Sequence, residues 1–202
     1  MLADELDGAA KMHANLAAAA YMSDDAANEV ASQYGYNLIK DDSDADRKLF
    51  ANDAGNAIIA FRGTDLKNKK NTFRDVLNDA AIMFGKQHLT PRFQKSEQSV
   101  ANALKKYNTV STTGHSLGAS QSMHVARNLG VTSYAYNPAF SIPHIAQSIK
   151  DRILYGKQPK EHNKVFTTYY DPISIAANLS LGARVHRVRQ REQDPHTIRN
   201  FL

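Results

Sequence analysis

The segment TGHSLGAS, residues 113–120, joins a predicted strand to a predicted helix. The β-branched residues before it indicate a strand over 109–113, and the helical spacing of apolar residues after it indicates a helix over 117–129. A Gly-x-Ser-x-Gly pattern in this setting predicts a tight turn that exposes Ser116 at the carboxyl edge of a sheet, rather than an ordinary glycine-bounded turn. The glycines fit such a turn, since neighbouring chain must pass very close to it. Ser116 is therefore a candidate nucleophile, and the amide of Leu117 is a candidate donor to an oxyanion.

Strands and helices alternate along the rest of the chain as well. Further strands are expected at 57–61, 132–136, 164–170 and 183–190. Helices are expected over about 6–21, 23–34, 72–84, 96–107, 117–129 and 142–152. The helix beginning at Ser96 is expected to turn Leu104 inward, and Asn137 and Pro138, which end a strand, are expected to line a pocket wall. This alternation is typical of a mostly parallel sheet flanked by helices on both faces, so we predict an α/β fold.

The length of 202 residues is typical of one domain, and we expect a single domain over residues 1–202. The chain has no cysteine, which excludes disulfides, thiolate metal sites and a cysteine nucleophile. No stretch is long and apolar enough for a membrane-spanning helix, and the first residues lack the pattern of a secretory signal. We therefore expect a cytoplasmic protein, or one exported by a non-classical route.

The net charge of +5 is divided unevenly along the chain. Residues 1–55 carry 11 acidic and 4 basic side chains, and residues 56–202 carry 9 acidic and 21 basic ones. A basic half is compatible with nucleic acid or with an anionic membrane surface. The aromatic interleaving of a nucleic-acid-binding segment is absent, so we expect no nucleic-acid partner but possible peripheral contact with an anionic membrane. The sequence indicates no protein partner.

Two further segments, together with TGHSLGAS, give the chain its likeness to a known family. They are AFRGTD (60–65) and YYDPIS (169–174), each at the end of a predicted strand. The three segments, in this order, resemble those of the class 3 lipase family of α/β-hydrolases. The resemblance implies an α/β-hydrolase fold in which Thr64 supplies the second oxyanion donor and Asp171 is the acid of a catalytic triad.

The order serine, acid, histidine of such a triad leaves few choices for the base. Only His186 and His196 follow Asp171 in the sequence. His186 lies within the alternating strand at 183–190, whereas His196 lies in a loop, so we expect His196 to be the base. Asp194 is the alternative acid, but Asp171 alone directly follows a predicted strand. Three other histidines are expected to be structural: His115, His124 and His144.

The resemblance implies a serine carboxylic-ester hydrolase that acts on lipid esters through an acyl-enzyme on Ser116. Within this class the sequence leaves open a triacylglycerol lipase, a phospholipase or galactolipase, and a short-chain esterase. The alternative from another class is a non-catalytic membrane-binding protein on the same scaffold. The mechanism needs no metal or organic cofactor, and the sequence contains no His-Glu-x-x-His metal motif.

The stretch 66–85 is the candidate lid. It begins with a lysine-rich loop and continues as an amphipathic helix whose apolar face includes Phe73 and Phe84. In the resembling family such a segment covers the active site, and at a lipid surface its apolar face could become buried in the interface. The lysines of the loop, which would favour anionic lipid, are Lys67, Lys69 and Lys70. A permanently docked core helix is the alternative.

Overall fold

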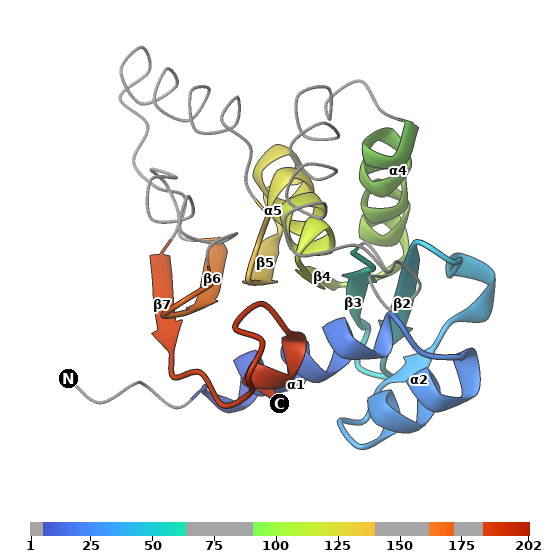
Figure 1. Ribbon diagram of the computed structural model, residues 1–202. Coiled ribbons are helices and arrows are strands. Elements are labelled where there is room, and N and C mark those ends of the chain that lie inside the picture. Colours follow the sequence, from blue (N-terminus) through green and yellow to red (C-terminus); the bar gives the residue numbers. More distant parts are fainter. Residues whose placement is uncertain (1–5, 64–90, 140–161, 172–183) are drawn as a thin grey trace, which may run out of the picture.

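The computed structural model describes residues 6–63, 91–139, 162–171 and 184–202, and Figure 1 shows their arrangement. Seven described strands form one sheet, and their order in the sheet follows their order in the sequence. The strands are β1 (Asn37–Leu38), β2 (Arg47–Ala51), β3 (Asn56–Phe61), β4 (Thr109–His115), β5 (Thr132–Tyr136), β6 (Asn163–Thr168) and β7 (Arg184–Val188). Neighbours from β3 to β7 pair in parallel, whereas β1, β2 and β3 pair antiparallel. The predicted mostly parallel sheet is confirmed.

Helices cover both faces of this sheet (Figure 1). One face carries α1 (Gly8–Ala19), α2 (Asp24–Ser32) and the short 3-10 helix η4 (Ile198–Phe201), and the other carries α4 (Pro91–Lys106) and α5 (Leu117–Leu129). A further 3-10 helix, η1 (Lys40–Asp42), precedes β2. Within the described ranges, no helix combines the length and apolar character needed to cross a bilayer. The predicted α/β layering, with a sheet between two helical layers, is therefore confirmed.

Strand β3 shows why the central strands are continuous apolar runs. Successive side chains of a strand point to opposite faces of the sheet. Ile58 and Ala60 lie in the core beneath α1 and α2, whereas Ile59 and Phe61 lie in the core beneath α4 and α5. Because both faces are buried, every position of the strand favours an apolar residue.

Most predicted elements lie where they were expected, and α4 is the main exception. Strand β5 and helix α5 have the predicted bounds. Helix α4 extends over Pro91–Lys106, whereas the sequence pattern predicts a helix only from Ser96. Ser96 lies inside the helix, and its hydroxyl donates to the carbonyl of Arg92 at 2.9 Å. Leu104, predicted to face inward, is 41% exposed.

Several predictions concern parts of the chain outside the described residues. These are the helices at 72–84 and 142–152 and the candidate lid at 66–85. Strands β1 and β2, which extend the sheet by two antiparallel strands, are not predicted from the sequence pattern. The sheet is thus mixed at one edge and parallel where the candidate site lies.

Helix α1 is fixed to the sheet partly through a buried histidine. His13 Nδ1 lies 2.8 Å from the carbonyl oxygen of Ala9, and its Nε2 lies 2.9 Å from Ser111 Oγ on β4. Its ring stacks on the ring of Tyr134, with 3.8 Å between the centroids. Burial lowers the pKa of His13 from 6.5 to about 4, so the neutral imidazole is the form that stabilises the fold.

The stability of the protein is therefore expected to fall below pH 6.5. The unfolded chain binds a proton at residue 13 between about pH 6.5 and 4 while the folded chain, with its lowered pKa, does not. The stabilisation is full above pH 6.5 and is lost as the pH falls, by about 3 kcal/mol in total for this group. Urea unfolding at pH 7.5 and 4.5 measures this loss of stability. His13→Phe, which keeps an aromatic ring over Tyr134, should show a smaller difference between the two pH values than the wild type. An equal difference would contradict this role of His13.

Candidate active site

Ser116 lies in a strained turn between β4 and α5. Its backbone angles are φ 57° and ψ −122°, a region that residues other than glycine rarely adopt. Its amide donates to the carbonyl of Tyr136 at 3.1 Å, and its own carbonyl accepts from the amide of Ala139 at 3.2 Å. The turn predicted from the sequence is present, and two hydrogen bonds hold it, one to the last residue of β5 and one to the chain just after β5.

Three glycines let the chain converge on this turn. A Cβ atom on Gly114 would lie 2.4 Å from the carbonyl carbon of Gly118, and one on Gly118 would lie 2.1 Å from the carbonyl oxygen of Phe61. A Cβ on Gly63, just after β3, would lie 2.6 Å from the carbonyl oxygen of His115. No side chain fits at such distances. The ends of β3 and β4 and the start of α5 therefore meet around Ser116 only because these positions lack a Cβ.

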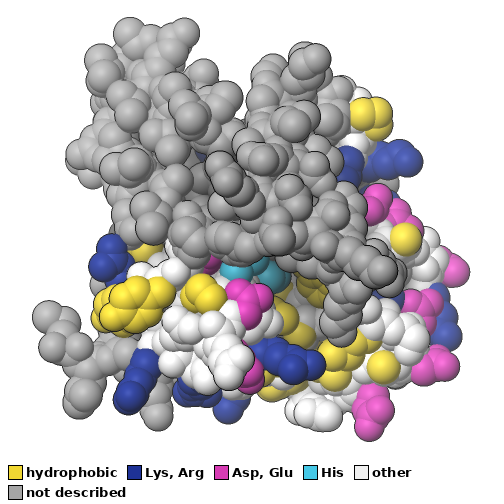
Figure 2. Space-filling model, viewed as in Figure 1, with side chains coloured by type: hydrophobic (Ala, Val, Ile, Leu, Met, Phe, Trp, Pro, Cys, Tyr) yellow, Lys and Arg dark blue, Asp and Glu magenta, His cyan; other side chains and the backbone are white. Residues whose placement is uncertain are grey.

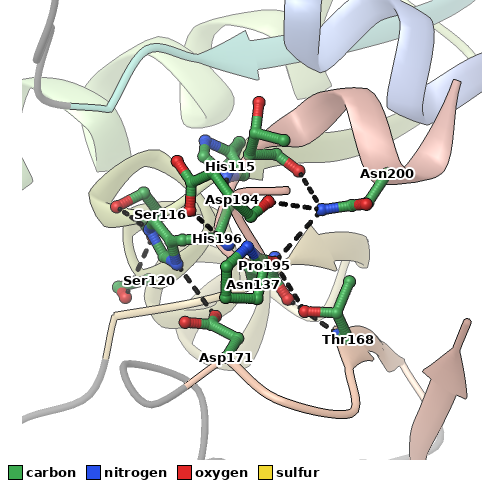
Figure 3. A network of polar contacts seen from close by, with 11 residues as sticks. His115, Ser116, Ser120, Asn137, Thr168, Asp171, Asp194, Pro195, His196 and Asn200 are labelled. Atoms are coloured by element: carbon green, nitrogen blue, oxygen red, sulfur yellow. Dashed lines mark hydrogen bonds and ion pairs between the residues drawn. The ribbon is translucent and has the colours of Figure 1, made fainter. Parts of the chain in front are cut away.

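The structure brings Ser116, His196 and Asp171 into one chain of hydrogen bonds (Figure 3). His196 Nδ1 lies 2.8 Å from Asp171 Oδ2, and His196 Nε2 lies 2.9 Å from Ser116 Oγ. With its proton on Nδ1, the imidazole donates to the carboxylate and accepts from the serine hydroxyl. Asp171 is 1% exposed and His196 3% exposed, so both lie out of bulk water. This arrangement can draw a proton from the hydroxyl and make its oxygen nucleophilic.

The two alternatives named from the sequence have other contacts. Asp194 is exposed, and its Oδ1 accepts from the backbone amide of His196 at 2.9 Å rather than from the imidazole. His186 lies on β7, and its ring stacks on Phe166 with 5.2 Å between the centroids. Within the described chain, Asp171 is thus the carboxylate that meets the imidazole of His196.

His115, predicted to be structural, supports the candidate base directly. Its Nε2 donates to the carbonyl oxygen of His196, and the centroids of the two imidazole rings lie 5.0 Å apart. Burial, with a smaller contribution from the neighbouring His196, lowers the pKa of His115 to about 3. His115 therefore stays neutral near pH 7 and adds no positive charge beside His196. Its place in the motif, next to the serine, could not reveal this contact because His196 is distant in the sequence.

Of the two candidate oxyanion donors, the structure describes Leu117, next to Ser116. Leu117 is the first residue of α5, so its amide belongs to the first turn, where backbone amides have no intrahelical acceptor. Thr64 lies outside the described residues. The residue before it, Gly63, donates its amide to Tyr21 Oη at 2.9 Å and lies against Ser116. The last described residue before Thr64 therefore lies beside the candidate nucleophile.

A comparison with protein-family models finds no match, and a comparison with curated protein sequences finds none either. Among solved structures, the chain is similar to a mutant of MDLA from Penicillium cyclopium, with a TM-score of 0.60 and 16% identity, covering 95% of this chain and 83% of that one. It is also similar to a fungal lipase, with a TM-score of 0.62 and 15% identity, covering 98% of this chain and 86% of that one. The chain has a lipase-like α/β-hydrolase fold.

The candidate site occupies the carboxyl edge of the parallel strands in this α/β-hydrolase fold. Ser116 follows β4, Asp171 lies just beyond β6, and His196 lies in the loop after β7. Ligands bind at this edge in open α/β sheets. Figure 2 shows histidine side chains near the middle of one face, with acidic and basic side chains interspersed around them. Among the described residues, no three or more histidine, aspartate or glutamate side chains are grouped so that they could hold a metal ion.

Proposed function

We propose that this chain is a serine carboxylic-ester hydrolase of the class 3 lipase family, acting on lipid esters. The observation that carries the proposal is the buried chain of hydrogen bonds from Ser116 through His196 to Asp171, at a strained turn. A structural serine needs neither a backbone in this rare conformation nor an imidazole aligned by a buried carboxylate. The lipase-like fold supports the same assignment.

The proposed reaction has two steps. Ser116 Oγ attacks the ester carbonyl while His196 Nε2 takes the hydroxyl proton, and the tetrahedral intermediate collapses as His196 gives that proton to the leaving alcohol. A water molecule then attacks the acyl-enzyme as His196 takes a proton from it. The second tetrahedral intermediate collapses by breaking the bond to Ser116 Oγ, His196 returns the proton to that oxygen, and the carboxylic acid leaves. Asp171 keeps the imidazole in the productive tautomer and stabilises the imidazolium that forms in each step.

The amides of Leu117 and Thr64 are the proposed donors to the oxyanion. The Leu117 amide has the favourable direction of a helix N-terminus, where the helix dipole stabilises negative charge. Thr64 follows Gly63, which lies against Ser116. In the proposed enzyme the segment 66–85 acts as a lid over this site.

Exposed aromatic side chains beside the site favour a lipid substrate. Tyr169 is 47% exposed and Tyr170 78% exposed, and both directly precede Asp171. The guanidinium of Arg187 lies over the Tyr169 ring, 5.8 Å from its centroid. Tyrosine suits the boundary between lipid and water because it has an apolar ring and a polar hydroxyl. With the lysines of the lid segment, this surface is the proposed point of peripheral contact with anionic lipid.

A panel of p-nitrophenyl esters from acetate to palmitate, together with phospholipid vesicles, tests the substrate class. We expect the rate on long-chain esters to rise more than proportionally once the substrate exceeds its solubility and forms an interface. We also expect anionic vesicles to be hydrolysed faster than zwitterionic ones. A preference for acetate with no response to an interface would assign a short-chain esterase instead. A folded protein without any ester hydrolysis would favour the non-catalytic membrane-binding alternative.

A further inference from the structure

A single buried amide side chain connects the parts of the chain that carry the proposed triad. Asn137 directly follows β5 and is fully buried. Its φ is +41°, and within the described ranges it shares a positive φ among non-glycine residues only with Ser116. Asparagine tolerates this conformation better than most side chains. The side chain was expected to line a pocket wall, but it forms hydrogen bonds in the interior instead.

Both ends of the Asn137 amide are used (Figure 3). Its Nδ2 donates to the carbonyl oxygen of Pro195 at 2.9 Å, and its Oδ1 accepts from the amide of Thr168 at 3.0 Å. Pro195 immediately precedes His196, and Thr168 ends the strand that leads to Asp171. The amide therefore joins the loop of the proposed base to the strand of the proposed acid.

Backbone groups on either side of Asn137 hold the backbone of Ser116 through hydrogen bonds. The carbonyl of Tyr136 accepts from the amide of Ser116, and the amide of Ala139 donates to the carbonyl of Ser116. One short segment, 136–139, thus contacts the backbone of Ser116 and, through the Asn137 side chain, the chain next to His196 and Asp171. A shift of this segment would change the distances between all three side chains together.

Two other groups also donate to the Pro195 carbonyl, but neither belongs to the segment 136–139 that contacts the backbone of Ser116. Thr168 Oγ1 donates to it at 2.5 Å, and Asn200 Nδ2 lies 3.2 Å from it. Asn200 lies on η4, five residues after Pro195, so its hydrogen bond is local in the sequence and does not join the loop of His196 to β6. Removal of the Asn137 side chain would also leave the buried amide of Thr168 without this acceptor, and buried backbone amides are rarely unpaired.

We infer that Asn137 is a positioning residue, which holds His196 against Asp171 and in line with Ser116 by bridging the Pro195 carbonyl and the Thr168 amide. The inference rests on the proposed function, because it assigns to Asn137 an effect on that reaction. The residue acts through its neighbours and takes no part in proton transfer.

Asn137→Gly is the decisive variant, because glycine accepts the positive φ and the change deletes only the two side-chain hydrogen bonds. Asn163→Ala is the matched control: Asn163 is also buried, but it lies at the opposite end of β6 from Asp171, and its Oδ1 has no hydrogen-bond partner. We expect Asn137→Gly to lower kcat for p-nitrophenyl ester hydrolysis by about 100-fold, as for a misplaced catalytic group. KM should change by less than about threefold, since substrate binding is not altered.

Proton NMR separates positioning from a general loss of stability. The Nδ1 proton of His196, held by a buried carboxylate, should give a far-downfield resonance, identified by its loss in His196→Asn. We expect that resonance in the wild type and in Asn163→Ala, and its loss or broadening in Asn137→Gly. If Asn137→Gly does not fold, Asn137→Asp replaces it, because aspartate keeps the acceptor for Thr168 but loses the donor to Pro195.

The outcomes distinguish this inference from the proposed function. An active wild type, with kcat and the His196 resonance unchanged in the Asn137 variant, would overturn the positioning role alone. A wild type as inactive as Ser116→Ala would overturn the proposed function. In that case the resonance still decides whether Asn137 holds the imidazole against Asp171.

Discussion

Ser116→Ala is expected to lower kcat for ester hydrolysis by about 10⁴- to 10⁶-fold, because no other group can form the acyl-enzyme. The substitution removes one oxygen from a turn that backbone hydrogen bonds and glycines hold in place, so the fold should persist. Steady-state kinetics with p-nitrophenyl butyrate and circular dichroism measure the two effects.

Ser122→Ala provides the matched control for this variant. Ser122 lies on α5, the helix that follows Ser116. Its hydroxyl is buried in the core, 2.8 Å from Thr112 Oγ1 and 2.7 Å from Ser133 Oγ. The control should lose some stability and keep its kcat within about twofold, since changes far from the reacting atoms leave transition-state stabilisation intact. Equal losses of activity in both variants would mean that Ser116 acts through the fold and not as the nucleophile.

Gly118→Ala is expected to cost about 3 kcal/mol of stability or more, together with nearly all activity. The added methyl carbon would lie 2.1 Å from the carbonyl oxygen of Phe61, a backbone atom that cannot rotate away. Either the end of β3 or the start of α5 must move. Leu117, a proposed oxyanion donor, begins α5, and Thr64, the other, follows β3 by three residues in the sequence. Urea unfolding and kcat for the same ester measure the two effects.

Gly8→Ala is the control for the added methyl group. Nothing lies within 4 Å of a Cβ atom at Gly8, at the start of α1. The free energy of unfolding of Gly8→Ala should stay within about 1 kcal/mol of that of the wild type. Any change should be a gain, because alanine has a higher helix propensity than glycine. A Gly118→Ala variant as stable and active as Gly8→Ala would show that β3 and α5 do not approach each other this closely.

The sequence predicts best those features that local residues determine. The β-branched run of β4, the glycines around Ser116 and the apolar run of β3 each specify their conformation over a few positions. Asp171 and His196 could also be named as candidates, because one follows a strand and the other lies in the last loop. The structure then shows that they meet at Ser116, while their catalytic roles remain a proposal.

Features that depend on distant partners could not be predicted. Strand β2 contains Lys48, a charged residue that argues against a buried strand, yet the structure buries it and pairs its ammonium group with Asp24 at 2.5 Å. The supporting contact of His115 likewise joins segments far apart in the sequence. The hydrogen bond from Asn137 to Pro195 also joins distant segments. No pattern of nearby residues indicates the contact of His115 or that of Asn137.

The uneven charge along the chain is partly neutralised in space. Asp42 pairs with Lys106 at 2.7 Å, and Asp46 lies 3.3 Å from Arg92, so acidic residues of the first part meet basic residues of α4. Such exposed pairs add little to stability. Their larger effect is on the surface field, since they leave fewer cations of this region free to attract anionic lipid.

Covalent labelling with a fluorophosphonate reports on the proposed nucleophile itself, because the reagent reacts with a serine only where a base activates its hydroxyl. Intact-mass and peptide analysis of the folded protein should show one adduct, on Ser116. Ser116→Ala should take up none, and His196→Ala should react far more slowly than the wild type. A folded wild type that takes up no reagent, or takes it up at another residue, would contradict the account.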